Sequence, residues 1–201
     1  IADLCDAHSA RLIVDDAHGI GVFGETGAGV CEHFGETDRV DLIIGTFSKS
    51  FASIGGFCAG DAAVISYLRH NARSLIFSAS IPPSACATVL TAIEIMRDEP
   101  ERRARLWQNA RRMQAELSGL GFDTFGSESP IIPAIVGGTL RTFEFWKRLL
   151  DAGVFTNPVI APAVPATSGR IRTSYMATHT DAQLDRVLDA FERVGREMGL
   201  I

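Results

Sequence analysis

Two short apolar runs, each followed at once by polar residues, constrain the fold of this chain more than any other feature. Residues 11–14 lead into Asp15, and residues 41–45 lead into Thr46. Apolar runs of this length between turn signals are typical of strands that are buried on both faces of a sheet. Such strands belong to α/β folds, in which polar side chains at the strand ends meet in one crevice.

The rest of the chain alternates between strand and helix patterns, and the glycine-rich segment 19–29 predicts a loop. Prolines, hydroxyls and acids that suit a first helical turn predict where several helices begin. We expect strands at 11–15, 41–46, 55–59, 75–77, 131–136, 153–156 and 170–175, and helices at 2–9, 62–72, 83–97, 101–118, 139–151 and 181–198. We place a domain boundary between the larger domain, 1–98, and the smaller α/β domain, 99–201.

Composition argues against two classes of partner. The net charge is −5 with acids and bases interspersed, so no basic block indicates nucleic-acid binding. No apolar run approaches the roughly 20 residues that a membrane span requires. The four cysteines lie far apart without CxxC spacing, which favours small buried thiols in a reducing, cytoplasmic compartment over a disulfide framework. We expect no metal site.

The two strand ends carry side chains suited to pyridoxal 5′-phosphate (PLP). Lys49 can form a Schiff base with the aldehyde, and Asp15 can keep the ring nitrogen protonated, which makes the ring an electron sink. His18 fits a partner for the ring oxygen. Thr46 and Ser48 offer hydroxyls to the phosphate. Together these residues predict a PLP site.

Each of these residues also has a simpler interpretation. A single lysine after a strand is commonly a surface residue, and an Asp-Asp pair is often a loop cap or a metal ligand. His18 alone fits a loop histidine, and Ser78 fits a helix cap before Pro82. The joint occurrence of an acid, a histidine and a lysine at two strand ends favours the cofactor site over the separate alternatives.

Three stretches of the sequence resemble the α-oxoamine synthases, which are fold-type I PLP enzymes. They are Val14–Gly21, Gly45–Ser50 and Ile76–Pro83, and Arg172–Ser174 and Thr178–Thr180 extend the resemblance nearly to the end of the chain. The resemblance implies the latter part of a fold-type I transferase, with a mostly parallel sheet in the large domain. Family members begin well upstream, so we expect that the ring-stacking residue is missing and that this segment alone is inactive.

The same resemblance implies a role for each matching residue. Lys49 matches the Schiff-base lysine, Asp15 the acid on the pyridine nitrogen, and His18 the partner of the ring oxygen. Thr46 matches the phosphate-binding threonine. Ser78 matches a hydroxyl that reaches the phosphate from the other subunit, which implies a homodimer with a shared active site.

One region departs from the family pattern. Many members hold the amino-acid carboxylate with an arginine before a Pro-Pro pair, whereas residues 159–165 contain no arginine. Arg172 or Arg170 is a candidate replacement, and an ion pair within the fold is the alternative for either residue. Asp16 matches no catalytic role, and we expect it to support its neighbours.

The implied reaction is a decarboxylative condensation of an amino acid with an acyl-CoA, in which Lys49 removes the α-proton. The motif wording is most like that of serine palmitoyltransferase, an enzyme of sphingolipid biosynthesis, which favours L-serine and a long-chain acyl-CoA. Glycine C-acetyltransferase and 8-amino-7-oxononanoate synthase are alternatives within the family. Outside it, an aminotransferase shares the acid and the lysine, and a non-catalytic partner subunit would lack the lysine.

Overall fold

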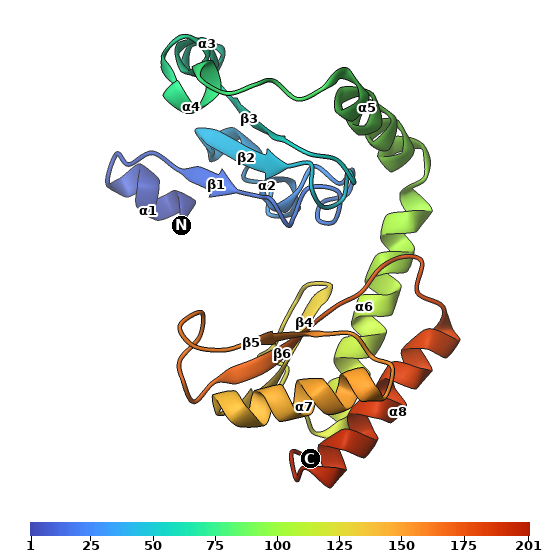
Figure 1. Cartoon of the computed structure of the whole chain (residues 1–201). Helices are drawn as coiled ribbons and strands as arrows, with labels where there is room; N and C mark the ends of the chain where they lie inside the picture. The colour runs from blue at the N-terminus through green and yellow to red at the C-terminus, as the bar shows by residue number, and fades with distance from the viewer. The chain divides into compact units, whose positions relative to one another are not determined.

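The computed structural model describes all residues from 1 to 201 (Figure 1). The chain divides into two compact units, Ile1–Arg103 and Ala104–Ile201, and the division falls within one long helix, α6 (Pro100–Leu120). Each unit combines a three-stranded sheet with helices, so the α/β class is confirmed. The domain boundary that we expect between residues 98 and 99 stays a prediction.

The sheet of the first unit has the strand order β1-β2-β3. β1 (Ile13–Asp15) runs parallel to β2 (Leu42–Thr46), and β3 (Gly56–Gly60) runs antiparallel to β2. All three strands lie where the sequence predicts them. The antiparallel third strand makes this sheet mixed, and the parallel pair β1 and β2 brings two strand ends to the same edge.

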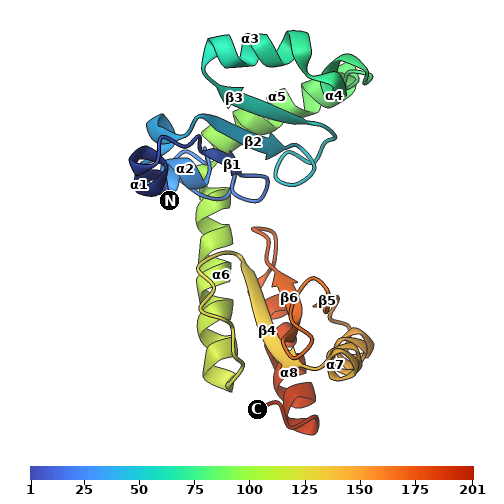
Figure 2. The ribbon, with the colours of Figure 1, turned by 90° about the vertical axis from the view of Figure 1, so that its left-hand side faces the viewer.

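Two helices of the first unit, α3 (Ala62–Asn71) and α5 (Pro83–Asp98), begin where the sequence predicts. Asp61 accepts a hydrogen bond from the Ala63 N–H (2.8 Å) at the start of α3, which lies beside β3 (Figure 2). Pro83 occupies the first turn of α5, where its missing N–H costs nothing. The helices wholly within this unit are α1 (Ala2–Ala7), α2 (Val30–His33), α3 (Ala62–Asn71), α4 (Arg73–Ile76) and α5 (Pro83–Asp98), with a 3₁₀ turn at Thr37–Arg39.

The strand expected at 75–77 is wrong, because α4 covers Arg73–Ile76. The N–H groups of Leu75 and Ile76 both donate to the carbonyl of Ala72 (3.0 Å each), and Phe77 continues the turn. Three apolar residues are too few to distinguish the strand period from the helix period. The backbone of this segment, directly after α3, is paired by local helical hydrogen bonds and not with a strand.

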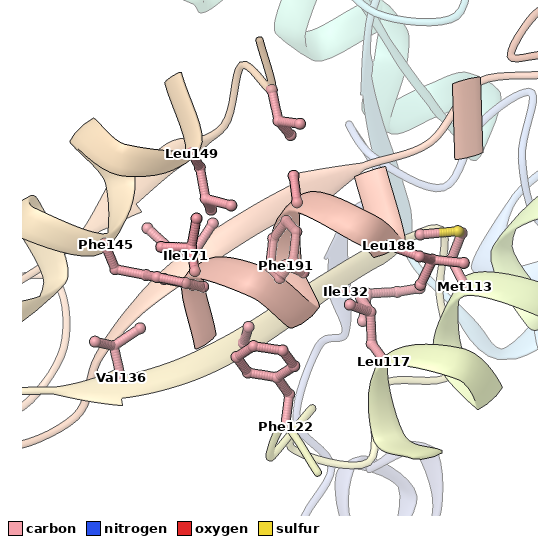
Figure 3. Packing of buried hydrophobic residues seen from close by; sticks show 14 of the residues in the cluster. Met113, Leu117, Phe122, Ile132, Val136, Phe145, Leu149, Ile171, Leu188 and Phe191 are labelled. Carbon is pink, nitrogen blue, oxygen red and sulfur yellow. The ribbon is translucent and has the colours of Figure 1, made fainter. Parts of the chain in front are cut away.

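The second unit packs helices against an antiparallel sheet with the order β4-β6-β5. The side chains of β4 alternate between buried and half-buried, as expected for a sheet with one covered face. Figure 3 shows the resulting core, in which three aromatic rings and branched aliphatic side chains interlock. The elements are β4 (Ile131–Gly137), α7 (Thr139–Asp151), β5 (Asn157–Val159), β6 (Gly169–Ser174) and α8 (Asp181–Glu197), together with most of α6.

The helix expected from residue 181 begins there with a capping box. Thr180 Oγ1 accepts from the Gln183 N–H (3.3 Å), and Gln183 Oε1 accepts from the Thr180 N–H (2.9 Å). These reciprocal bonds satisfy two backbone donors that the helix itself leaves free. The cap fixes the start of α8 beside the chain segment that leaves β6.

The strand expected at 153–156 lies four residues later, as β5 (Asn157–Val159). The N–H groups of Gly153 and Val154 donate back to Leu150 and Leu149 (2.9 Å each), so these residues complete the end of α7. Val154 is buried in the core without joining the sheet. The apolar residues of this segment indicate that it is buried. The sequence pattern alone cannot tell a buried loop from a strand that pairs in a sheet.

All four cysteines are free thiols, and only Cys31 is buried. The expectation that all four are buried is therefore wrong for Cys58 and Cys86, which are exposed, and for half-buried Cys5. No helix has the length and apolarity that crossing a membrane requires. No group of three or more His, Cys, Asp or Glu residues is placed to hold a metal ion.

Candidate active site

The carboxyl ends of β1 and β2 place an acid and a hydroxyl on one face of the sheet. Asp15 is in register with Ile44 on the parallel neighbour strand, and Thr46 lies two residues beyond Ile44. Side chains two residues apart share a face of a strand. Asp15 and Thr46 therefore project from the same face at adjacent strand ends, as the sequence predicts.

A pair of hydroxyls follows the end of β2. Thr46 Oγ1 and Ser48 Oγ lie 2.9 Å apart, and the Ser48 N–H donates to Thr46 Oγ1 (3.3 Å). The backbone N–H groups of Lys49 and Ser50 have no hydrogen-bond partner in the protein. Two hydroxyls and two unpaired amide N–H groups within five residues form the kind of donor set that binds phosphate oxygens.

The loop that carries Lys49 is joined to the loop after β1. Ser50 Oγ donates to the carbonyl of Ile20 (2.8 Å), which lies two residues after His18. The lysine loop also closes on itself, because the Ser53 N–H donates to the Phe47 carbonyl (2.8 Å). These bonds bring the histidine loop and the lysine loop together at the same edge of the sheet.

The three residues predicted for catalysis are all exposed in this chain. Asp15 uses one carboxylate oxygen, Oδ1, to accept from the Ala17 N–H (3.0 Å), and Oδ2 makes no hydrogen bond. The Lys49 side chain makes no hydrogen bond or ion pair, so its amine is available, and the Lys49 carbonyl accepts from the Ala52 N–H (3.0 Å). His18 lies three residues after Asp15 on the same loop.

Asp16, next to the predicted acid, anchors the glycine-rich loop from inside. Its side chain is 2% exposed, and Oδ2 accepts from the Val30 N–H (2.7 Å). A Cβ added at Gly19 would lie 1.8 Å from Asp16 Oδ1, and one at Gly29, where φ is +104°, would lie 1.9 Å from Oδ2. Only glycine fits at either position, and the expected supporting role of Asp16 agrees with this geometry.

Burial raises the pKa of the Asp16 carboxyl above its ordinary value, even though the Val30 N–H favours the charged form. The folded protein therefore binds this proton more tightly than the unfolded chain does. The contribution of Asp16 to stability is largest at low pH and falls as pH rises from the unfolded pKa through the folded one.

We expect the Asp16→Asn variant to gain in unfolding free energy relative to the wild type as pH rises from about 3 to about 7, because asparagine does not titrate. Urea denaturation at several pH values measures the difference. Asp41→Asn is the matched control: the Leu12 N–H and then Arg11 lower the pKa of Asp41, so this variant should lose stability over the same range. If the unfolding free energies of the two variants, relative to the wild type, changed in the same direction with pH, the opposite pKa shifts of Asp16 and Asp41 would be contradicted.

Two predicted residues are not joined to this group. Ser78 follows α4, and its hydroxyl donates to the carbonyl of Ser74 without bonding to Thr46 or Lys49. Arg172 lies on β6 in the second unit and forms no ion pair. Arg170 donates from Nε to the Ser168 carbonyl (3.1 Å) and lies 5.3 Å from the centre of the Phe125 ring. The ion-pair alternative is therefore wrong for both arginines in this chain.

Ser50 is a contributor to the site that sequence reasoning missed. It follows Lys49 directly in the motif, but its function depends on a bond to Ile20, thirty residues earlier. The one sequence signal that could have identified Ser50 is its position, because it is a hydroxyl residue directly after the predicted cofactor lysine. The sequence offers no sign of the carbonyl that receives it.

Comparison with known proteins gives consistent relationships. The model of the family described as aminotransferase class I and II matches residues 1–191. The chain is 52% identical over 194 residues to serine palmitoyltransferase of Sphingobacterium spiritivorum, covering 96% of this chain and 49% of that protein. It is 44% identical over 201 residues to 8-amino-7-oxononanoate synthase of Alkaliphilus oremlandii, covering 100% of this chain and 51% of that protein.

Solved structures give the same relationship. The chain superposes on Sphingomonas wittichii serine palmitoyltransferase with a TM-score of 0.94 and 39% identity, covering 100% of this chain and 51% of that one. A structure described as SPT with PLP also has a TM-score of 0.94, with 37% identity, covering 100% of this chain and 51% of that one. The chain spans about half the length of the curated relatives it matches. Both enzyme names belong to the α-oxoamine synthases, which confirms the resemblance found in the sequence.

Proposed function

Because the chain belongs to the aminotransferase class I and II family, we propose that the edge formed by β1 and β2 binds pyridoxal 5′-phosphate. The observation that carries the proposal is the set of donors after β2: the Thr46 and Ser48 hydroxyls 2.9 Å apart, next to two unpaired amide N–H groups. This set fits a phosphate dianion. The free Oδ2 of Asp15 and the unpaired ammonium group of Lys49 supply the other two groups that the cofactor needs.

The residues of this edge would then divide the work, and Lys49 would have two tasks. Asp15 holds the proton on the ring nitrogen, His18 donates to the ring oxygen, and Thr46 and Ser48 hold the phosphate. Lys49 would hold the cofactor through its aldehyde, and its Nζ would accept the α-proton of the amino acid. When bound, the cofactor supplies an electron sink for the carbanion that this proton transfer creates.

We propose that the whole protein condenses an amino acid, L-serine by preference, with a long-chain acyl-CoA. A C–C bond forms between the amino-acid α-carbon and the acyl carbon, the thioester C–S bond breaks, and CoA leaves as a thiol. The amino-acid carboxylate leaves as CO₂, and the product is an α-amino ketone. The names of the relatives support this assignment, because serine palmitoyltransferase and 8-amino-7-oxononanoate synthase both appear among them.

We expect the full-length protein to release free CoA from L-serine with a long-chain acyl-CoA faster than from any other pair. A thiol assay over L-serine, glycine and L-alanine, each with short, long and dicarboxylic acyl-CoAs, measures this preference. Fastest release with glycine and acetyl-CoA would indicate glycine C-acetyltransferase. Fastest release with L-alanine and a dicarboxylic acyl-CoA would indicate 8-amino-7-oxononanoate synthase.

The same assay separates this proposal from the other classes. An aminotransferase would form a keto acid without CoA release, and a non-catalytic partner subunit would form neither. We further propose that the protein is a cytoplasmic homodimer in which Ser78 reaches the phosphate of the partner's site. The exposure of Ser78, and its bond to the nearby Ser74 carbonyl alone, support this role because the hydroxyl lies on the surface of its own subunit.

A further inference from the structure

The glycine-rich segment 19–29 folds around a carboxylate that is not among the groups proposed to hold PLP. Glu32, in the first turn of α2, accepts from the Thr26 N–H at Oε1 (3.0 Å) and from the Ala28 N–H at Oε2 (2.8 Å). A Cβ added at Gly24 would lie 2.0 Å from Oε2. Both oxygens of this carboxylate therefore bind the loop backbone, and their close approach requires a glycine in the loop.

The Glu32 carboxylate is kept in its charged form. Its side chain is half-buried, which favours the neutral acid, but the two backbone N–H groups and the nearby Arg103 outweigh burial and lower the pKa of Glu32 below its ordinary value. Arg103 also donates to the carbonyl of Glu25, so an anion and a cation bind the same part of the loop. Hydrogen bonds to a charged carboxylate are among the stronger ones in proteins, and here they fix the backbone of residues 26–28.

A short series of bonds connects this carboxylate to the lysine loop. Gly27 lies between the two residues that Glu32 binds, and its carbonyl accepts from the Gly21 N–H (2.8 Å). The same peptide unit holds the Ile20 carbonyl, which accepts from Ser50 Oγ (2.8 Å). A trans peptide unit is planar, with its N–H and C=O pointing in opposite directions. The bond at the Gly21 N–H therefore sets the direction of the carbonyl that Ser50 reaches.

The Ser50 side chain lies directly against this peptide unit. A Cβ added at Gly21 would lie 2.6 Å from Ser50 Cβ and 2.9 Å from Ser50 Oγ. The Lys49 side chain has no hydrogen bond or ion pair of its own. The place of its amine thus depends on the backbone that carries it, and Ser50 ties that backbone to the glycine-rich loop.

We propose that Glu32 is a positioning residue for Lys49. Glu32 holds residues 26–28 so that the bond between Gly21 and Gly27 turns the Ile20 carbonyl toward the lysine loop. The bond from Ser50 to this carbonyl then fixes the backbone at Lys49. The inference rests on the proposed function, because the aldehyde of PLP is the group that the amine must reach. Glu32 acts only through these bonds.

The test is reductive labelling of Lys49 by PLP in the full-length protein, with the labelled fraction measured by mass spectrometry over a range of PLP concentrations. Glu32→Ala should need about tenfold more PLP for half-labelling than the wild type, because it removes two hydrogen bonds to a charged group. Glu36→Ala is the matched control: its carboxylate pairs with Arg39 (2.9 Å) and makes no bond to the glycine-rich loop, so labelling should be unchanged. If Glu32→Ala does not fold, Glu32→Gln and Glu36→Gln give the same comparison with a shift of about threefold.

A double variant separates positioning from a general loss of stability. Ser50→Ala alone should also shift half-labelling about tenfold, and Glu32→Ala combined with Ser50→Ala should shift it no further, because both act through one series of bonds. Independent effects would multiply to roughly a hundredfold and would overturn the proposal. Half-labelling of Glu32→Ala at the wild-type PLP concentration would also overturn it while leaving the proposed PLP site intact. An unlabelled Lys49 in the wild type would overturn the PLP site and this inference with it.

Discussion

The Lys49→Ala variant of the full-length protein is expected to lose turnover by a factor of at least about 10³, because one amine serves both as nucleophile and as proton acceptor. The same variant should no longer be labelled when the protein is incubated with PLP and reduced with borohydride. In the wild type this reduction turns the C=N bond between Lys49 Nζ and the cofactor into a stable C–N bond. Mass spectrometry should then find the added phosphopyridoxyl group on the peptide that contains Lys49.

Within these 201 residues the only other lysine is Lys147, which serves as an internal control. Lys147 is the matched control: it lies on α7, is exposed and pairs with Asp151. Lys147→Ala should keep both the label and the turnover. A label on Lys147, or a Lys49→Ala variant that still releases CoA at the wild-type rate, would contradict the proposed role.

The backbone pattern around this lysine could be read from the sequence because each strand there is a short apolar run bounded by polar residues, although Ile13 and Ile44 are exposed in this chain. β1 and β2 are apolar runs closed by polar residues, and such boundaries survive folding. The strand predictions for 75–77 and 153–156 were wrong because these segments lack such clear boundaries. In each, local helical or turn hydrogen bonds, such as those donated by the N–H groups of Ile76 and Val154, take the place of pairing with a neighbouring strand.

The candidate site likewise contains residues that the sequence predicts and contacts that it does not. Asp15, Thr46 and Lys49 follow from residue type and from their place at strand ends. The contact between Asp16 and the Val30 N–H spans fourteen residues of glycine-rich loop and depends on backbone angles that side-chain identities do not specify. The bond from Ser50 to Ile20 likewise requires the loops after β1 and β2 to meet. This meeting depends on the pairing register of β1 and β2. Sequence thus predicts the candidate reacting groups, and the tertiary contacts show which side chains and backbone groups lie around them.

The Phe191→Ala variant should lose about 3–5 kcal/mol of unfolding free energy, the range for removing a buried aromatic ring. Phe191 is 0% exposed, and its ring packs edge-on against Phe145 and Phe122, with centroids 5.5 Å apart in both pairs (Figure 3). The three rings come from α8, α7 and the loop after α6, so the cavity would lie where three segments meet. Because whole domains are stable by only about 5–15 kcal/mol, this loss is a large share of the total.

Urea denaturation of three variants tests the packing argument. Phe191→Leu fills most of the cavity and should cost less than half as much as Phe191→Ala, because the penalty grows with the empty volume left behind. Phe155→Ala is the control for ring loss alone: Phe155 is 77% exposed, so we expect a change within about 0.5 kcal/mol. If Phe191→Ala cost no more than Phe155→Ala, the three rings would not be the packed centre of this unit. The stability of the helices that frame β6 would then have to come from elsewhere.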